Sequence, residues 1–275
     1  MDKKLQAYYT NSDYITDYMI NKLDVQHGDT VLEPSVGEGA FIKKIIKCNK
    51  DICIDVYDID DYAISLVKQK YGTMDNVSIY KADTLFDKRL DLLCDNHDGY
   101  TKIIGNPPYG AYLSMDTRKL LKSKYSAIYA KETYVLFFYR GLKLLKTNGK
   151  MVFIIPDTFL FLNYHKKFRK YLFENFCVEE IAIFPSKLFY GVSFAYSNLS
   201  IITIKNDKKS VFKNKIKIYD KIKGEKQFDE IGKGLIKPKI ISQKSVIENF
   251  NNTLYLNKKI AELINKSKTT LGGFG

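Results

Sequence analysis

Few residues in this sequence are of the kinds that bind metal ions or form cross-links. Among 275 residues there are 4 cysteines and 3 histidines, and tryptophan is absent. Neither cysteines nor histidines fall at the paired spacings of a disulfide framework or a zinc site. We therefore expect no metal centre, and we expect a reducing compartment, the cytoplasm. The residues concerned are Cys48, Cys53, Cys94, Cys177, His27, His97 and His165.

Long apolar runs are also missing. No segment approaches the roughly 20 apolar residues that a membrane-spanning helix needs, and residues 1–4 lead into no apolar core of a signal peptide. We therefore expect no membrane partner. The hydrophobic content of 45% and the aromatic content of 14% nevertheless suffice for a packed core. The length suits one sizeable α/β domain with an appendage.

Acidic residues are scarce relative to basic ones. The 31 Asp and Glu residues face 44 Lys and Arg residues, which gives a net charge of +13. This excess favours a polyanionic partner such as nucleic acid. A lysine-rich composition is also typical of proteins from AT-rich genomes, and solvated lysine faces would explain part of the excess, so both interpretations stay open.

Short apolar runs alternate with segments of helical period through most of the chain. This alternation predicts a mainly parallel sheet covered by helices on both faces. A run at 215–219 alternates like an edge strand, and residues 257–266 have a helical pattern. The predicted strands are 30–33, 52–56, 77–80, 102–104, 151–155, 178–184 and 198–205; the predicted helices lie within 5–23, 42–46, 62–71, 131–146 and 163–174.

The sequence Gly-Asn-Pro-Pro-Tyr at residues 105–109, here called the proline corner, stops the strand at 102–104 abruptly. Two consecutive prolines stiffen the turn and leave carbonyls free to accept hydrogen bonds. Asn106 adds a side-chain oxygen, and Tyr109 adds a flat ring. Paired acceptors beside a stacking face suit a planar substrate with an exocyclic amino group. An ordinary loop tip is the alternative.

A second candidate segment, residues 34–41, is here called the glycine loop. It follows the strand at 30–33 and leads into a helix, the context of a nucleotide-binding loop. Gly37 and Gly39 would let the backbone approach a ligand, and Glu33 could meet a ligand ammonium group. Asp58, about twenty residues further on, is placed to bind ribose hydroxyls. A structural turn remains the alternative for the glycines, because no Lys-Ser or Lys-Thr follows them.

Three further segments leave alternatives open. Asp83 follows the strand at 77–80 and could accept from the amine of an adenine, or simply form a turn. Residues 110–130 show no clear period and are predicted as a long loop, either a binding segment or a surface excursion. An aromatic residue of the segment 184–194 could face Tyr109 across a base; Phe189 is the first candidate, ahead of Tyr190 and Phe194.

Taken in order, these segments resemble the gamma class of DNA adenine-N6 methyltransferases from restriction–modification systems. The resemblance covers roughly residues 5–205. Asn11 departs from the family's usual Pro, and Ser35 and Val36 replace the commoner Ala-Cys. The matching segments are residues 9–19, residues 31–41, Asp58, residues 82–83 and residues 106–109, with Phe189 matching more loosely.

The resemblance implies a Rossmann-like S-adenosylmethionine-dependent methyltransferase fold with a mostly parallel seven-stranded sheet and helices on both faces. It implies transfer of a methyl group from S-adenosyl-L-methionine to N6 of an adenine flipped out of double-stranded DNA. Residues 1–206 would form the catalytic domain, and residues 207–275 an extension towards a recognition domain absent from the sequence. A cognate restriction endonuclease and activity at the nucleoid in a prokaryotic cytoplasm are also expected.

The resemblance assigns two sets of site residues. The catalytic set is Asn106, Pro107, Pro108, Tyr109 and Phe189. The cofactor-binding set is Tyr9, Thr10, Glu33, Pro34, Gly37, Gly39, Asp58, Ile59, Asp83 and Asn106. Two alternatives remain: an N-methyltransferase acting on an rRNA base or a protein glutamine amide, and an inactive DNA-binding scaffold.

Overall fold

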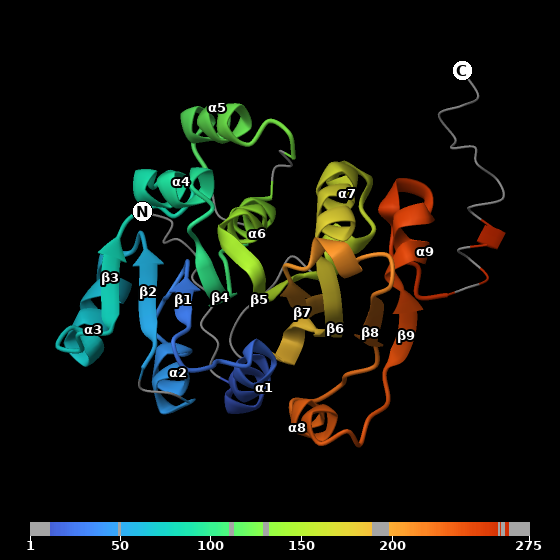
Figure 1. Cartoon of the computed structure of the whole chain (residues 1–275), viewed down its shortest axis with the longest axis horizontal. Coiled ribbons are helices and arrows are strands. Elements are labelled where there is room, and N and C mark those ends of the chain that lie inside the picture. The colour runs from blue at the N-terminus through green and yellow to red at the C-terminus, as the bar shows by residue number, and fades with distance from the viewer. Residues whose placement is uncertain are drawn as a thin grey trace.

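A nine-stranded sheet runs through the part of the chain that the computed structural model describes, which is residues 12–48, 51–109, 113–128, 132–188, 198–257, 259 and 262–263. Figure 1 shows this sheet from β3 at one edge to β9 at the other. The strand order is β3-β2-β1-β4-β5-β7-β6-β8-β9. The strands are β1 (Thr30–Glu33), β2 (Cys53–Asp58), β3 (Val77–Lys81), β4 (Tyr100–Gly105), β5 (Leu145–Pro156), β6 (Cys177–Pro185), β7 (Asn198–Lys205), β8 (Lys215–Tyr219) and β9 (Lys239–Ser242).

The pairing is parallel from β3 through β5 and between β6 and β8. Strand β7 runs antiparallel to both β5 and β6, and β9 runs antiparallel to β8. The prediction of a mostly parallel sheet with helices on both faces is therefore confirmed. The described residues form nine strands rather than the expected seven, because β8 and β9 extend the sheet beyond β6.

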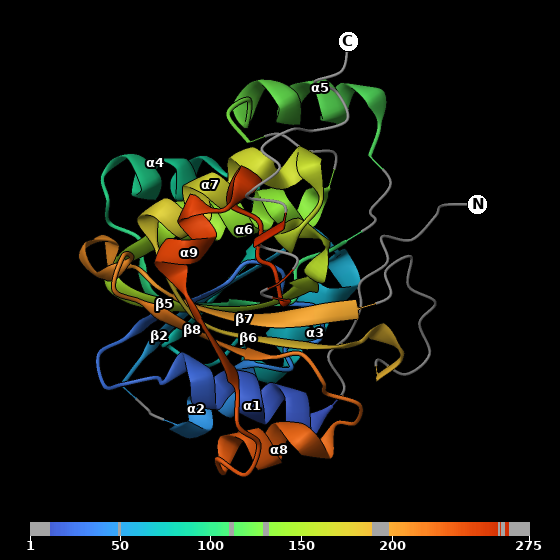
Figure 2. The ribbon, with the colours of Figure 1, turned by 90° about the vertical axis from the view of Figure 1, so that its right-hand side faces the viewer.

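Helices cover both faces of the sheet. Figure 2 shows α1, α2 and α8 on one face and α4, α6, α7 and α9 on the other, with α5 outside α4 and α6. No helix among these described residues is long and apolar enough to cross a membrane. The α-helices are α1 (Asp13–Leu23), α2 (Ile42–Cys48), α3 (Asp61–Tyr71), α4 (Lys88–Asp95), α5 (Met115–Lys124), α6 (Thr133–Leu144), α7 (Lys166–Asn175), α8 (Lys226–Gly232) and α9 (Gln243–Glu248). Short 3₁₀ helices are η1 (Asp157–Leu160), η2 (Asn163–His165), η3 (Ser186–Leu188), η4 (Lys208–Ser210) and η5 (Phe250–Asn252).

Two local predictions are wrong. Residues 147–149, whose Gly149 is typical of a helix C-cap, do not end the predicted helix at 131–146, because β5 already begins at Leu145 and contains them. Asn148 has a φ of 63° and donates its N–H to the carbonyl of Asn206 at 2.8 Å. The predicted loop at 110–130 contains α5, which Ser114 caps by accepting from the N–H of Thr117. Leu121 is its buried apolar residue, so a helical period was not visible.

The residues after 206 continue the sheet. Strand β8 lies between β6 and β9 rather than at the edge, contrary to the prediction. Helix α8 packs on α1, where Ser12 Oγ donates to Glu225 at 2.8 Å and the rings of Tyr18 and Phe228 lie 5.0 Å apart. The predicted boundary at residue 206 is thus not a break in the sheet, and the recognition domain stays a prediction. The helix expected at 257–266 lies largely outside the described residues.

Candidate active site at the carboxyl edge of the sheet

The strand order reverses between β1 and β4, which are neighbours that lead to opposite halves of the sheet. In open α/β sheets, ligands bind beyond the carboxyl ends of the strands at such a reversal. The glycine loop follows β1 and the proline corner follows β4. The two touch, because Ser35 Oγ donates to the main-chain carbonyl of Asn106 at 3.2 Å. A side chain at Gly105 would crowd this contact, since a Cβ there would lie 3.3 Å from Pro34 Cδ.

Hydrogen bonds tie the glycine loop to the carboxyl end of β2. The N–H of Gly37 donates to Asp58 Oδ2 at 2.9 Å, and the N–H of Val36 donates to the carbonyl of Tyr57 at 2.9 Å. Gly37 and Gly39 have φ angles of 50° and 78°, in the left-handed region that favours glycine. Asp58 therefore contacts the glycine loop directly through Gly37, and its predicted role in binding ribose stays a prediction.

Three predicted cofactor residues lie at the ends of β2 and β3. The Asp58 carboxylate accepts from the N–H groups of Gly37 and Asp60, while burial raises its pKa. Ile59 is 50% exposed and offers an apolar surface at the edge. Asp83 accepts from the N–H of Leu85 at 2.9 Å, and burial raises its pKa as well. The two strand ends are joined by the N–H of Ala82, which donates to the carbonyl of Asp58.

Glu33, at the end of β1, is a buried carboxylate at this edge. Its side chain is 1% exposed, and its Oε2 has no hydrogen-bond partner among the described residues. Burial, and to a smaller extent the charge of Asp58, raise the pKa of Glu33 well above its usual value. A buried carboxylate is costly unless it is protonated or paired with a cation. The chemistry of this carboxylate therefore fits a cationic ligand that reaches the end of β1.

The proline corner is held on its far side by α6. Thr133, the first residue of that helix, donates its hydroxyl to the carbonyl of Pro108 at 2.9 Å. Asn106 is partly exposed, whereas Tyr109 is 1% exposed. The side chain of Tyr109 is therefore buried next to the partly exposed Asn106.

Several predicted site residues lie outside the described part of the chain. They are Tyr9, Thr10 and Phe189, with the alternatives Tyr190 and Phe194, and their roles stay predictions. Sequence reasoning missed the hydroxyl groups of Ser35, Thr84 and Thr133, each of which donates to a carbonyl of the site. The adjacency of Thr84 to Asp83 was the available signal.

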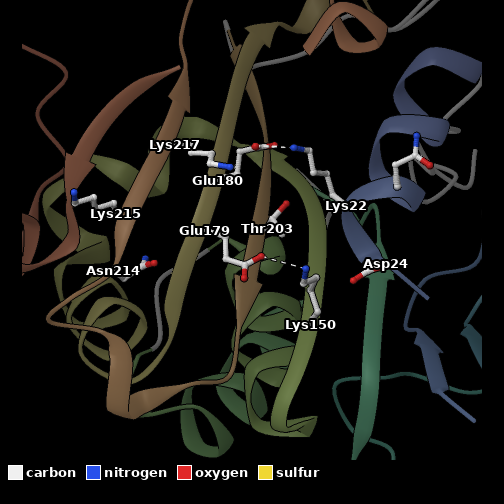
Figure 3. Close-up of a pocket in the computed structure, with 10 residues that line it drawn as sticks. Lys22, Asp24, Lys150, Glu179, Glu180, Thr203, Asn214, Lys215 and Lys217 are labelled. Carbon is white, nitrogen blue, oxygen red and sulfur yellow. Dashed lines mark hydrogen bonds and ion pairs between the residues drawn. The ribbon is translucent and has the colours of Figure 1, made fainter. Parts of the chain in front are cut away.

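A cavity at the opposite, amino edge of the sheet has a different character. Figure 3 shows its side chains, which enclose about 440 Å³. Lys22 pairs with Glu180 at 2.7 Å, and Lys150 pairs with Glu179 at 3.3 Å. None of the predicted site residues that the structure describes lines this cavity, which is formed by Asn21, Lys22, Asp24, Lys150, Glu179, Glu180, Thr203, Asn214, Lys215 and Lys217.

Comparison with known families identifies one that matches the middle of the chain. Residues 39–189, more than half of the chain, match the Eco57I restriction-modification methylase family. The chain belongs to this family. The matched range contains Asp58, Asp83 and the proline corner, whereas Glu33 and most of the glycine loop precede it.

Individual type II methyltransferases are also similar in sequence to this chain. The type II methyltransferase M.AccI of Acinetobacter calcoaceticus is 29% identical over 185 residues, which cover 65% of this chain and 32% of that protein. The type II methyltransferase M.HincII of Haemophilus influenzae is 29% identical over 219 residues, covering 73% of this chain and 40% of that protein. The chain therefore spans about a third to two fifths of the length of these relatives.

Solved structures support the fold assignment. A protein of Vibrio vulnificus YJ016, assigned as a modification subunit of a type I restriction enzyme, superposes with a TM-score of 0.69 at 17% identity, over 88% of this chain and 56% of that one. A Listeria monocytogenes protein assigned as a class I S-adenosylmethionine-dependent methyltransferase gives 0.60 at 18% identity, over 77% of this chain and 66% of that one. The Eco57I-family chain thus has the fold of S-adenosylmethionine-dependent methyltransferases.

Proposed function

We propose that this chain is the catalytic part of a DNA methyltransferase of a restriction–modification system, acting on N6 of adenine with S-adenosyl-L-methionine as methyl donor. One observation carries the proposal. The glycine loop and the proline corner, predicted separately as cofactor and substrate segments, meet at the strand reversal through Ser35 and Asn106. Membership of a restriction-modification methylase family supports the same activity.

The residues present fit the proposed cofactor. Its cationic part would lie near Glu33, whose buried Oε2 otherwise lacks a partner among the described residues. Gly37 and Gly39 would let the backbone approach it, because glycine has no Cβ and tolerates the positive φ angles of these positions. Asp58 would accept from ribose hydroxyls, and Asp83 and Ile59 would contact the adenine ring. When bound, S-adenosyl-L-methionine supplies an electrophilic methyl group on sulfur.

The proline corner would supply the acceptors for the substrate amine. Asn106 Oδ1 and the carbonyl of Pro107 would accept from the two N6 hydrogens and turn the nitrogen lone pair towards the methyl group. Positive charge develops on the nitrogen during transfer, so fixed acceptor dipoles stabilise the transition state more than the ground state. A duplex base must leave its stack to reach this corner, at an expense of a few kcal/mol. Tyr109 and an aromatic residue of 184–194 would then hold the base by stacking, worth about 1–3 kcal/mol per contact.

The test is methylation by the full-length protein with labelled S-adenosylmethionine and unmethylated duplex DNA, followed by sequencing that maps the modified base. We expect label at N6 of adenine within one short recognition sequence. Label in RNA or in protein would replace the proposed substrate. A calorimetric titration that detected no binding of S-adenosylmethionine would instead identify an inactive scaffold.

A further inference from the structure

Three hydroxyl groups hold the carbonyls of the two proline-containing loops. Thr84 Oγ1 donates to the carbonyl of Pro34 at 2.6 Å, Ser35 Oγ to that of Asn106 at 3.2 Å, and Thr133 Oγ1 to that of Pro108 at 2.9 Å. These bonds link, in order, the end of β3, the glycine loop, the proline corner and the start of α6. They form one continuous path across the carboxyl edge of the sheet.

The prolines explain why hydroxyl groups are needed here. A proline has no N–H, so Pro34, Pro107 and Pro108 cannot be anchored through backbone donors of their own. The carbonyls of Pro34, Asn106 and Pro108 still require hydrogen-bond donors, because an unpaired backbone group is costly away from water. Side-chain hydroxyls supply these donors. Thr84 and Thr133 are both well buried, so their hydroxyl groups have little access to water as an alternative partner.

We propose that Thr133, Ser35 and Thr84 are positioning residues of the methyl-transfer site, with Thr133 setting the orientation of the acceptor carbonyl of Pro107. The inference rests on the proposed function and goes one step beyond it. Pro107 lies between the two held carbonyls of Asn106 and Pro108, so rotation of its peptide group is restricted from both sides. The carbonyl of Pro107 is thereby left to face the substrate amine at a fixed angle.

Loss of each hydroxyl group should affect either cofactor affinity or turnover, depending on which loop the hydroxyl holds. Thr84 holds Pro34 in the glycine loop, so its loss acts on cofactor affinity. Thr133 holds Pro108 in the proline corner, so its loss acts on turnover. Ser35 joins the two loops and acts on both, with a weaker effect because its hydrogen bond is the longest of the three.

The experiment compares Thr133→Val with Thr133→Ser, which restores the hydroxyl, and with Thr203→Val, a matched change of a buried threonine at the amino edge. Single-turnover methylation by the full-length protein should fall about 10- to 100-fold in Thr133→Val, because a displacement of order 1 Å at the reacting groups has effects of this size. The dissociation constant for S-adenosylmethionine should stay within about twofold. Thr133→Ser should recover most of the turnover, and Thr203→Val should retain it.

Amide hydrogen exchange of residues 103–106 and 109 gives a readout that does not depend on activity. Exchange there should accelerate in Thr133→Val and stay unchanged in Thr203→Val. Thr84→Val should show the opposite division, with weakened cofactor binding and little change in turnover at saturating cofactor. Wild-type turnover and exchange in Thr133→Val would overturn the inference, as would equal losses in Thr133→Val and Thr203→Val. A wild-type protein that transfers no methyl group to DNA would refute the proposed function, while hydrogen exchange would still decide whether Thr133 holds the corner.

Discussion

The two edges of the sheet use polar groups in opposite ways. At the amino edge, the buried Glu180 accepts from the hydroxyl of Tyr18, and it pairs with Lys22 (Figure 3), so both of its oxygens are satisfied. At the carboxyl edge, Glu33 is equally buried, yet its Oε2 has no partner among the described residues. Satisfied buried polar groups stabilise a fold, whereas an unsatisfied one marks a position that a ligand completes. The contrast separates a structural edge from the edge where we propose that the ligands bind.

The largest effect on activity is expected from Asn106→Ala. Loss of one fixed acceptor dipole should lower turnover by about 10²- to 10³-fold, the range found for single donors or acceptors that act in a transition state. Cofactor affinity should stay close to that of the wild type, because the glycine loop is held separately by Asp58 and Thr84. Single-turnover methylation and calorimetry measure the two quantities. Equal loss of both would show that Asn106 acts through the fold.

The second test is Glu33→Gln, which removes the charge from the carboxyl edge. Affinity for the cationic cofactor should fall about 10- to 100-fold, the equivalent of a charge-assisted hydrogen bond of about 1.5–3 kcal/mol. Wild-type affinity should rise with pH through the raised pKa of Glu33, because the ionised carboxylate binds the cation. The variant should lose this slope. A pH-independent wild-type affinity would contradict the role of Glu33.

Glu33→Gln should lower cofactor affinity but raise the stability of the cofactor-free protein. Since the pKa of Glu33 is raised in the folded state, its protonated form favours folding, and this contribution is lost as the pH rises through the raised value. Glu33→Gln should therefore be more thermostable than the wild type at alkaline pH and similar to it in acid. Thermal unfolding across the pH range, without cofactor, measures the difference.

A smaller effect is expected at the amino edge. Glu180→Ala should lower the free energy of unfolding by about 2 kcal/mol, below the 3–5 kcal/mol of a fully buried broken pair, because Lys22 is partly exposed and can regain water. Cofactor affinity should not change. Denaturant unfolding gives the first quantity and calorimetry the second; a variant with wild-type stability and weakened cofactor binding would reverse the assignment of the two edges.

The smallest effect is predicted for Lys150→Ala. Its ion pair with Glu179 is long and partly exposed, and such pairs are worth about 0–1 kcal/mol. We expect a change in unfolding free energy within that range and a further decrease of the effect in high salt. A larger loss would mean that the cavity at the amino edge depends on this pair.

Local patterns predicted much of the fold because local chemistry forms its elements. Ser12 caps α1 and Asp60 caps α3, each through an oxygen of its own side chain. The buried runs of β1 and β4 end at the glycine loop and the proline corner, where their glycines and prolines stop them. Helix α5 was missed because its buried contact with the protein comes from Leu121 alone among its residues.

For the candidate site, sequence alone supplied the residue types at Glu33, Asp58, Asp83 and Asn106. Their arrangement depends on which strands are neighbours, and that pairing joins residues far apart in the chain. The bond between Ser35 and Asn106 spans 71 positions, and the burial of Tyr109 depends on packing around its ring. No local sequence pattern predicts either the bond or the burial.

The sequence alone determined that this protein has an α/β sheet with two candidate loops. It did so through the order of its short apolar runs and the turns that end them. Periodicity and turn chemistry act over a few residues, so the sequence contains them directly. The tertiary structure alone decided that β8 and β9 join the same sheet and that Glu33 is buried without a partner among the described residues. It also decided that three hydroxyls bond carbonyls of the two loops, because burial and long-range hydrogen bonds exist only once distant strands pack together.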